Sequence, residues 1–448
     1  NAPAATAFRS LNRVAALRLQ PGDSVLFRRG DVFRGTLPVR QSGLLGKPIV
    51  LDAFGSGPKP VLAGSAAVTG WTRVGGNVWQ ASCSTCGSRV TGLFQNGASL
   101  PLGRYPNADA PHRGYLTVQA HVGKTGLTSQ QPLPADFTGG EAVMRKTQWI
   151  IDRALVTGQQ GNVLMLKGES NYDISDGWGF FLQNHPATLD QNGEWCYDSA
   201  TKTLRLFDSG NPNARTVTAT VFEKCLDIHE VSHVTVRNLR LTEALTANLA
   251  GRGISHLRFE ANDLTNAGED GLALDGAGTD IRIEGNRIAG VNNNGLRIDA
   301  YRNVTIRQNT FRNVGTAAGR GGSGDGQYIG LRVHSTENTL VEGNVIDSVG
   351  YNGIAFTDNA RIQRNVISNY CLTKTDGGGI YAWNFLRRPM RDVHLISNLI
   401  FNGIGAPEGT VRGDGYTGVN GIFLDECIEN VEITGNSIFD NRGRGMFL

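Results

Sequence analysis

Short runs of alternating apolar and polar residues repeat along the chain from Cys225 onward. Alternation over four to six residues predicts β-strands with one buried face rather than helices. Each run closes at an asparagine, and the first intervals between these asparagines are 24, 24 and 23 residues. A repeat of this length that is made of strands alone is typical of a solenoid. The asparagines are Asn238, Asn262, Asn286, Asn309, Asn344, Asn365, Asn398 and Asn436.

A second strand, opened by a glycine, follows most of these asparagines. Two or three strands per repeat without a helix predict a parallel β-helix, and the LxxLxL pattern of leucine-rich repeats is missing. The crossover rule makes its coil right-handed. We therefore expect an all-β, right-handed parallel β-helix in which the asparagines stack as a ladder inside one turn. The glycines are Gly271, Gly295, Gly330, Gly353, Gly379, Gly421 and Gly445.

The first part of the chain, residues 1–67, is expected to hold a cap and the first coils. Residues 5–19 have apolar positions at helical spacing, which predicts a helix that covers the open end of the solenoid. The main β-helix is expected over 223–448. Its last strand stops at Leu448 without a cap, which leaves room for the natural protein to continue.

Residues 68–222 break the period and carry five of the six tryptophans, which predicts an inserted β-rich domain. Within it, two strand-like runs at 194–198 and 203–207 flank a short polar turn and predict a hairpin.

Composition limits the function classes. The 448 residues are 40% apolar, which allows a sizeable core and excludes disorder. The net charge of +3 gives no strong field, so neither nucleic acid nor a membrane is expected as a partner. The 59 glycines fit many tight turns between short strands.

Six cysteines are too few and too scattered for a disulfide scaffold. For Cys83 and Cys86, a local disulfide or plain thiols are favoured over a metal or redox site. The start, Asn-Ala-Pro-Ala-Ala, suits a mature chain whose export signal has been removed, so we expect a secreted or periplasmic protein.

The candidate chemistry lies on the strands that the glycines open. The first and third residues after each glycine are apolar and are expected to point inward, so the second and fourth point outward. Because coils stack ~4.8 Å apart, the outward residues form two ladders on one exterior sheet. They are Arg297 and Asp299, Arg332 and His334, Tyr381 and Trp383, Phe423 and Asp425, with Asp275 on an earlier coil.

Insertions point to the same face. The segments 315–327, 370–378 and 405–417 all precede this strand, and 384–391 follows it. Long loops on one side of a solenoid usually build its binding face, so these loops are expected to wall a groove across the ladders.

The sharpest motif in the expected groove is Thr375-Asp376-Gly377-Gly378-Gly379. The glycines suggest a bulge that re-aims Asp376 over the sheet, although Asp376 could also simply cap a turn. Lys374 is the only lysine after Lys224 and is either a substrate-binding residue or a solvated loop residue.

Tyr381 and Trp383 are expected to form a platform for a sugar ring, or else to contact the loop above. Asp425 and Glu426 follow in the next coil. Two carboxylates can act as acid and nucleophile when ~5 Å apart, or as acid and base when ~6.5–9.5 Å apart. Asp376 and Asp425 lie at opposite ends of their strands and can meet only if the glycines fold Asp376 back.

Asp275 and Asp299 are a competing acidic pair. The alternative is that these two aspartates have a structural role, in a polar ladder in which Arg297 neutralises them.

The sequence resembles the right-handed β-helix carbohydrate-active enzymes of the pectate-lyase-like superfamily. The opening Gly-Asp-Ser-Val-Leu-Phe-Arg-Arg-Gly at 22–30, with Pro-Ile-Val-Leu-Asp-Ala-Phe-Gly at 48–55, carries the resemblance. The stretch Leu-Gln-Asn-His-Pro at 182–186, together with DGGGIYAW and GIFLDE, is most similar to the bacterial glycoside hydrolases of this fold. The resemblance implies secretion, a saccharide substrate and an acidic pair in the groove, which we place on Asp376 and Asp425 with Glu426 in reserve.

A polysaccharide lyase on the same fold is the alternative enzyme. A lyase removes a proton beside a uronate carboxylate with a basic residue or tyrosine, for which Arg297, Arg332, His334 and Lys374 are candidates. No dense acidic cluster for calcium is present, and no cofactor or metal is expected. A non-catalytic glycan-binding solenoid is the third possibility.

Arginines in the expected walls hint at an acidic glycan. They are Arg297, Arg332, Arg387, Arg388, Arg391 and Arg412.

Overall fold

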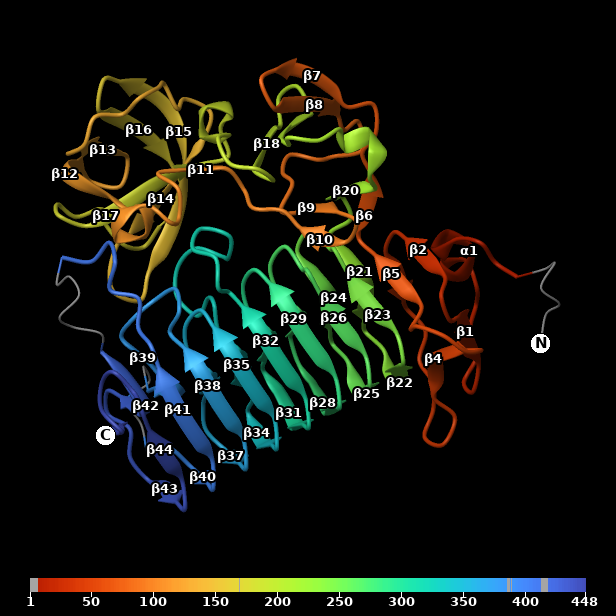
Figure 1. Cartoon of the computed structure of the whole chain (residues 1–448). Helices are drawn as coiled ribbons and strands as arrows, with labels where there is room; N and C mark the ends of the chain where they lie inside the picture. Colours follow the sequence, from red (N-terminus) through yellow and green to blue (C-terminus); the bar gives the residue numbers. More distant parts are fainter. Residues whose placement is uncertain (1–6, 169, 385–386, 388, 412–417) are drawn as a thin grey trace.

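A computed structural model describes residues 7–168, 170–384, 387, 389–411 and 418–448. Within these residues the chain winds into a solenoid of three long parallel sheets with ten strands each (Figure 1). Each strand pairs in parallel with the equivalent strands of neighbouring coils. The expected all-β parallel helix is confirmed. No helix in the described part of the chain is long and apolar enough to cross a membrane.

The three sheets are named A, B and C in the order in which a coil visits them. Sheet A holds β1 (Ser24–Arg28), β4 (Ile49–Phe54), β22 (Ser232–Arg237), β25 (Ser255–Glu260), β28 (Gly278–Glu284), β31 (Tyr301–Arg307), β34 (Glu337–Glu342), β37 (Ala360–Gln363), β40 (Val393–Ile396) and β43 (Val431–Thr434). Sheet B holds β2 (Val32–Arg34), β5 (Val61–Ala63), β23 (Arg240–Thr242), β26 (Asp263–Thr265), β29 (Arg287–Val291), β32 (Thr310–Val314), β35 (Val345–Val349), β38 (Val366–Tyr370), β41 (Leu399–Gly403) and β44 (Ser437–Phe439). Sheet C holds β3 (Leu37–Val39), β21 (Lys224–His229), β24 (Ala247–Arg252), β27 (Leu272–Asp275), β30 (Leu296–Asp299), β33 (Leu331–His334), β36 (Ile354–Phe356), β39 (Gly377–Trp383), β42 (Val419–Asp425) and β45 (Met446–Phe447).

The N-terminal helix is much shorter than expected. Helix α1 covers only Leu11–Ala15, and residues 1–6 lie outside the described residues. Its one buried residue is Leu11, which joins the core cluster of the solenoid. A single buried position per turn does not hold a longer amphipathic helix against the first coil.

The chain leaves the solenoid after β5 and returns at β21, which pairs with β3 as the next strand of sheet C. The strands between them form three further sheets. One holds β6 (Ser65–Ala67), β9 (Leu93–Gln95), β10 (Ala98–Ser99) and β20 (Val217–Thr220), and another holds β7 (Thr72–Gly75), β8 (Val78–Ser82), β18 (Trp195–Asp198) and β19 (Thr203–Phe207). The third holds β11 (Arg104–Tyr105), β12 (Leu116–Val122), β13 (Gly126–Ser129), β14 (Glu141–Arg145), β15 (Ile151–Gln160), β16 (Val163–Lys167) and β17 (Gly179–Gln183).

The third of these sheets closes on itself, because β17 pairs with both β12 and β14. This barrel lies over the C-terminal coils, whereas the sheet of β7, β8, β18 and β19 lies nearer the N-terminal end (Figure 1). The expected hairpin is confirmed, since β18 and β19 pair antiparallel. Cys83 and Cys86 form a disulfide, as one of the favoured alternatives proposed.

A ladder of buried asparagines runs through the solenoid, as the repeat predicts. The Nδ2 of each donates to the Oδ1 of the next, over 3.3 Å from Asn262 to Asn286 and 2.9 Å from Asn286 to Asn309. Each Nδ2 also donates to a backbone carbonyl of the preceding coil, and each Oδ1 accepts from the preceding asparagine's backbone N–H. The ladder continues in the same way through Asn344, Asn365, Asn398 and Asn436.

Asn238 is not part of the ladder, so that expectation is wrong by one residue. Its position is taken by Leu239, whose backbone N–H donates to Asn262 Oδ1 over 3.0 Å. Asn238 instead has a φ of 59° and donates from Nδ2 to Asp52 Oδ1. The left-handed backbone that asparagine tolerates explains why it occupies this turn.

The glycines that open the strands of sheet C are required by close packing between coils. A Cβ on Gly353 would lie 2.5 Å from the carbonyl oxygen of Gly379, and one on Gly295 would lie 2.4 Å from that of Gly330. No side chain fits at such distances, so these coils need glycine here, whereas Cys225 and Asn248 take the equivalent position in earlier coils.

Replacing Asn309 by alanine tests the ladder. The substitution removes the acceptor of the buried Asn286 N–H and the donor to Ile283 O and Asn344 Oδ1, and is expected to lower the free energy of unfolding by at least about 3 kcal/mol. The control is Asn171→Ala, an exposed asparagine of the inserted domain, for which we expect a loss of about 0.5 kcal/mol or less. Urea denaturation of the two variants measures the difference. Equal losses would contradict a stabilising ladder.

Candidate active site

A large cavity lies over the C-terminal half of sheet C. Its volume is about 1380 Å³, above the roughly 300–1,000 Å³ of ordinary small-molecule pockets. Outward side chains of β33, β36, β39, β42 and β45 line it, together with residues of the loops 315–327, 370–378 and 405–417. The cavity therefore lies where the insertions predict a groove.

The inserted barrel holds two of these loops in place. Arg145 of β14 is buried and donates from Nη1 to the carbonyl oxygen of Thr373 over 2.7 Å, and from Nη2 to that of Ala406. Charge-assisted hydrogen bonds to backbone carbonyls fix the walls without using any group of the cavity.

The structure brings together most of the residues singled out from the sequence. Those that line the cavity are Asp376, Tyr381, Trp383, Asp425, Glu426, Arg332 and His334. Arg297, Asp299 and Lys374 are not in its lining as far as the described residues show. Arg388 and residues 412–417, with Arg412, lie outside the described residues.

Asp425 and Tyr381 form the central polar contact. Tyr381 Oη donates to Asp425 Oδ2 over 3.1 Å from the neighbouring strand. Burial raises the pKa of Asp425, and the hydrogen bond from Tyr381 opposes that rise because it stabilises the charged form. A carboxyl group with a raised pKa can hold a proton and deliver it, which is the property of a general acid.

Three carboxylates act on the phenol of Tyr381. Burial raises the pKa of Tyr381 first, and the charges of Asp425, Asp376 and Asp325 raise it further, in that order. The hydroxyl of Tyr381 therefore stays protonated and is placed among acidic groups from three coils.

Asp376 and Asp425 approach Tyr381 from opposite ends of the strands. Asp376 directly precedes β39, and Trp383, its last residue, pairs with Asp425 on β42. The phenolic hydroxyl of Tyr351 donates to the backbone carbonyl of Asp376 over 2.7 Å and fixes this corner of the cavity.

The expected glycine bulge is wrong. β39 keeps one continuous register with β42 from Gly377 to Trp383. The glycines serve packing instead, because a Cβ on Gly377 would lie 2.6 Å from Asn352 Oδ1. That same oxygen accepts from the backbone N–H of Gly378 over 2.8 Å. Asp376 is presented by its own left-handed backbone, with φ of 61°.

Trp383 and Glu426 lie at the outer end of the cavity. Trp383 is 50% exposed. Its indole N–H donates to Glu426 Oε2 over 3.4 Å, and Arg387 Nη2 lies 3.6 Å from the same oxygen. The indole is held at its edge while a large area stays accessible, as a sugar-stacking residue requires.

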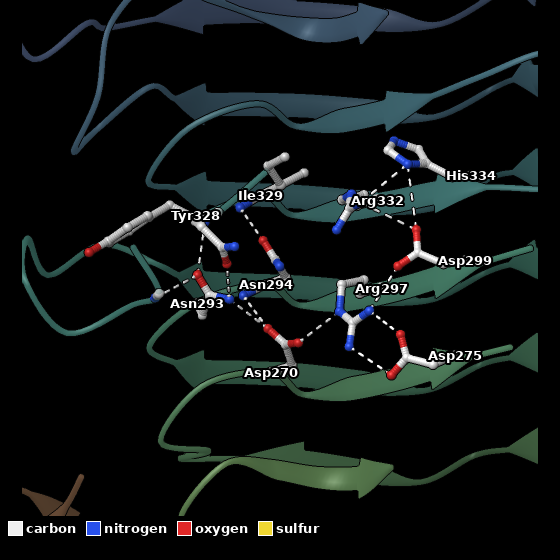
Figure 2. A network of polar contacts seen from close by, with 12 residues as sticks. Asp270, Asp275, Asn293, Asn294, Arg297, Asp299, Tyr328, Ile329, Arg332 and His334 are labelled. Carbon is white, nitrogen blue, oxygen red and sulfur yellow. Dashed lines mark hydrogen bonds and ion pairs between the residues drawn. The ribbon is translucent and has the colours of Figure 1, made fainter. Parts of the chain in front are cut away.

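Figure 2 shows the polar ladder that continues from the cavity toward the N-terminal coils. Arg297 joins Asp275 to Asp299, with 2.8 Å between its Nη1 and Asp299 Oδ2. Asp270, Asp275 and Asp299 hold the pKa of Arg297 above its ordinary value although burial alone would lower it. Asp275 and Asp299 are therefore neutralised by an arginine between them, as the polar-ladder alternative predicts.

The ladder ends at the cavity in His334. Its Nδ1 lies 3.5 Å from Asp299 Oδ1 and 3.3 Å from Arg332 Nη2 (Figure 2). Burial, followed by the charge of Arg332, lowers the pKa of His334 to about 4. The imidazole is therefore neutral at neutral pH.

Lys374 is buried behind the cavity wall, which excludes a solvated loop lysine. Its ammonium lies 4.6 Å from the ring centre of Tyr328 and 5.3 Å from that of Tyr351. Nζ donates to the carbonyl oxygen of Gln327 over 3.4 Å and so links two of the loops. Burial, followed by the charge of Arg145, lowers the pKa of Lys374 to about 7.

Asp325, Tyr172 and Trp149 also line the cavity, although no sequence pattern pointed to them. Tyr172 Oη donates to Asp325 Oδ1 over 3.0 Å, and Trp149 Nε1 donates to Tyr172 Oη over 3.3 Å. The two aromatic residues come from the inserted domain and Asp325 from an expected loop. The many tryptophans of the inserted domain were the one sequence signal for these residues. Because that domain has no sequence repeat, its position above sheet C could not be predicted.

Comparisons with known proteins agree with the fold. Residues 224–400 match the family model described as the right handed beta helix region. A solved structure described as a glycoside hydrolase superposes with a TM-score of 0.71 at 14% identity, over 97% of this chain and 90% of that one. Comparison with curated protein sequences gives no match.

Two other solved structures are more distant. A lacto-N-biosidase from Eubacterium ramulus has a TM-score of 0.42 at 12% identity, over 99% of this chain and 64% of that one. An alginate lyase from a Paenibacillus species has a TM-score of 0.40 at 11% identity, over 95% of this chain and 94% of that one. The fold itself rests on the three parallel sheets, the family model and the first of these structures, and it is the right-handed parallel β-helix that the resemblance implied.

Replacing Tyr381 by phenylalanine tests the central contact. Loss of the phenolic donor removes a hydrogen bond to the charged carboxylate, so the pKa of Asp425 is expected to rise. Carbon-13 NMR titration of labelled aspartate carboxyls measures it. Tyr197→Phe, which removes a hydroxyl bonded to Gly87 in the inserted domain, is the control and is expected to leave it unchanged. An unchanged or lowered value in Tyr381→Phe would contradict this geometry.

Proposed function

We propose that the protein is a glycoside hydrolase that cleaves a poly- or oligosaccharide in the cavity over sheet C. The observation that carries the proposal is Asp425, a carboxyl group with a raised pKa that is hydrogen-bonded to Tyr381 in a cavity containing Asp376 and the accessible indole of Trp383. An acid of raised pKa beside a second carboxylate is the arrangement that glycosidic hydrolysis requires.

In the proposed mechanism Asp425 protonates the oxygen of the leaving sugar. Asp376 acts as the second carboxylate, either on a water molecule or on the anomeric carbon. Glu426 is the reserve candidate, but its hydrogen bond to Trp383 favours a role in orienting the indole. Tyr381 positions Asp425 and keeps its own proton.

Substrate binding is proposed for Trp383 and for Arg332 with His334. Arg332 lines the cavity, and its buried Nε has no hydrogen-bond partner in the described residues. Asp299 holds Arg332 and His334 in place through ion pairs, and Arg297 in turn pairs with Asp299. Lys374 supports the walls. No cofactor is proposed.

We also propose that the protein is exported. The Cys83–Cys86 disulfide supports this, because disulfides persist mainly in oxidising compartments.

Amide variants of the two aspartates test the mechanism. Asp425→Asn and Asp376→Asn are each expected to lower kcat by at least about 10²-fold, the ordinary contribution of acid–base catalysis. Asp280→Asn, on sheet A, is the matched control and is expected to keep full activity. Hydrolysis rates on a panel of neutral and uronate polysaccharides measure the effect. Full activity of Asp425→Asn would contradict the proposed acid.

A polysaccharide lyase is the second candidate. The neutral imidazole of His334 beside Arg332 and the cavity favours it, since a neutral base and a nearby cation suit proton removal next to a uronate carboxylate. The masses of the products separate the two reactions, because a hydrolase adds one water and a lyase leaves an unsaturated product. Unsaturated products that disappear in His334→Ala would replace the hydrolase with the lyase.

A further inference from the structure

A second cavity lies in the inserted domain and shares no lining residue with the first. Its volume is about 600 Å³. It lies between the barrel, which contributes Arg153 of β15, and the hairpin, which contributes Arg205 of β19; Arg320, from the loop 315–327, also lines it. It has room for a short saccharide, and neither the proposed reaction nor the fold requires it.

Of its four arginines, only one forms an ion pair in the described part of the chain. Arg89 pairs with Glu269 over 2.7 Å. In the described part of the chain, however, Arg153, Arg205 and Arg320 form no ion pair within 4.0 Å. Elsewhere Arg297 is engaged by carboxylates, whereas Arg145 bonds to backbone carbonyls. Three guanidinium groups without an ion pair meet in this one cavity, although partly buried charges are ordinarily paired.

The two acidic residues of the lining are engaged by neutral donors. Gln183 Nε2 donates to Glu141 Oε2 over 2.8 Å. Asp198 caps a turn, where it accepts from the backbone N–H of Ala200 and from the hydroxyl of Thr201. Both carboxylates keep their charge, but the four arginines of the lining outnumber them, so the cavity has an excess of positive charge.

Burial, together with the positive charge of Arg153, acts on the pKa of Arg320. The guanidinium of Arg320 donates to the carbonyl oxygen of Thr91 and lies 5.6 Å from the ring centre of Trp195. Burial, followed by the charge of Arg153, lowers the pKa of Arg320 to about 10. An anion in the cavity would offset the repulsion between Arg153 and Arg320. It would also accept hydrogen bonds from the guanidinium N–H groups of Arg153.

Neutral hydroxyls complete the lining. Ser88, Thr138 and Ser199 lie at the cavity surface beside the arginines. Hydroxyl groups can donate to and accept from sugar hydroxyls, whereas guanidinium groups match carboxylate or sulfate geometry.

We propose that this cavity is an accessory binding site for an acidic saccharide, one that carries carboxylate or sulfate groups. The site holds the glycan by its charges at a distance from the cavity over sheet C. It does not depend on the proposed hydrolysis, since binding here requires neither Asp376 nor Asp425.

Isothermal titration tests the site with two probes of the same length. The charged probe is a galacturonic acid trimer, and the neutral probe is the same trimer with its carboxylates methyl-esterified. The protein carries Asp425→Asn so that turnover does not consume either probe. The charged trimer is expected to bind at least about tenfold more tightly than the ester, and its binding is expected to weaken with salt.

Variants then locate the binding. Arg153→Ala and Arg205→Ala are each expected to weaken binding of the charged trimer at least about tenfold, the loss of one charge-assisted hydrogen bond. Arg302→Ala, an exposed arginine on β31, is expected to leave it unchanged. Arg153→Gln and Arg205→Gln repeat the test with more of the side chain kept, and circular dichroism checks that each variant is folded.

Several results would overturn the site. They are equal affinity for the two trimers, no binding of the charged trimer, or binding that survives Arg153→Ala and Arg205→Ala but is lost in Trp383→Ala. A titration with inorganic sulfate separates the saccharide from a free anion. Binding of sulfate without binding of the charged trimer would also overturn the assignment.

Discussion

The stacking of successive coils at ~4.8 Å is the constraint on which the rest of the structure depends. The buried asparagines keep the coils in register, because each side chain bonds to the coils before and after it. The glycines of sheet C let the backbones approach so closely that a single Cβ would collide with the next carbonyl. With register fixed, any outward residue on sheet C has a neighbour directly beside it on the next coil. Tyr381, opposite Phe423, can therefore reach diagonally to Asp425. Arg297 likewise lies between Asp299 of its own strand and Asp275 of the preceding coil.

Stacking alone builds a flat face, and the insertions turn that face into a cavity. Arg145 of the inserted barrel fixes two wall loops through their carbonyl oxygens. Tyr172 of the same domain donates to Asp325 of the loop 315–327. The carboxylate of Asp325 is the third that raises the pKa of Tyr381. The regular solenoid thus supplies the floor and the acid, and the irregular domain supplies the rest of the enclosure. The second cavity, with three arginines that form no ion pair, lies between the irregular domain and the loop 315–327.

Much of this arrangement could be predicted from the sequence because it follows from periods. Alternation along the strands placed Arg332, His334, Tyr381, Trp383 and Asp425 on one outward face, and they line one cavity. Where a turn rather than a strand decides the position, prediction failed by single residues. Asn238 has the expected residue type, but Leu239 occupies the ladder position.

Contacts between segments far apart in sequence could not be predicted. The burial of Lys374 depends on Tyr328 and Tyr351 from other coils, and no local pattern around Lys374 reveals them. Tyr172 meets Asp325 across 153 residues for the same reason. Nor does Thr375-Asp376-Gly377 reveal that its glycines pack against Asn352 instead of forming a bulge.

The most direct test of the account is cleavage of an oligosaccharide substrate in water enriched in oxygen-18, followed by mass spectrometry of both products. If Asp425 delivers a proton and water completes the reaction, one product gains a single heavy oxygen at its new reducing end. Unsaturated products without the label would contradict hydrolysis in this cavity.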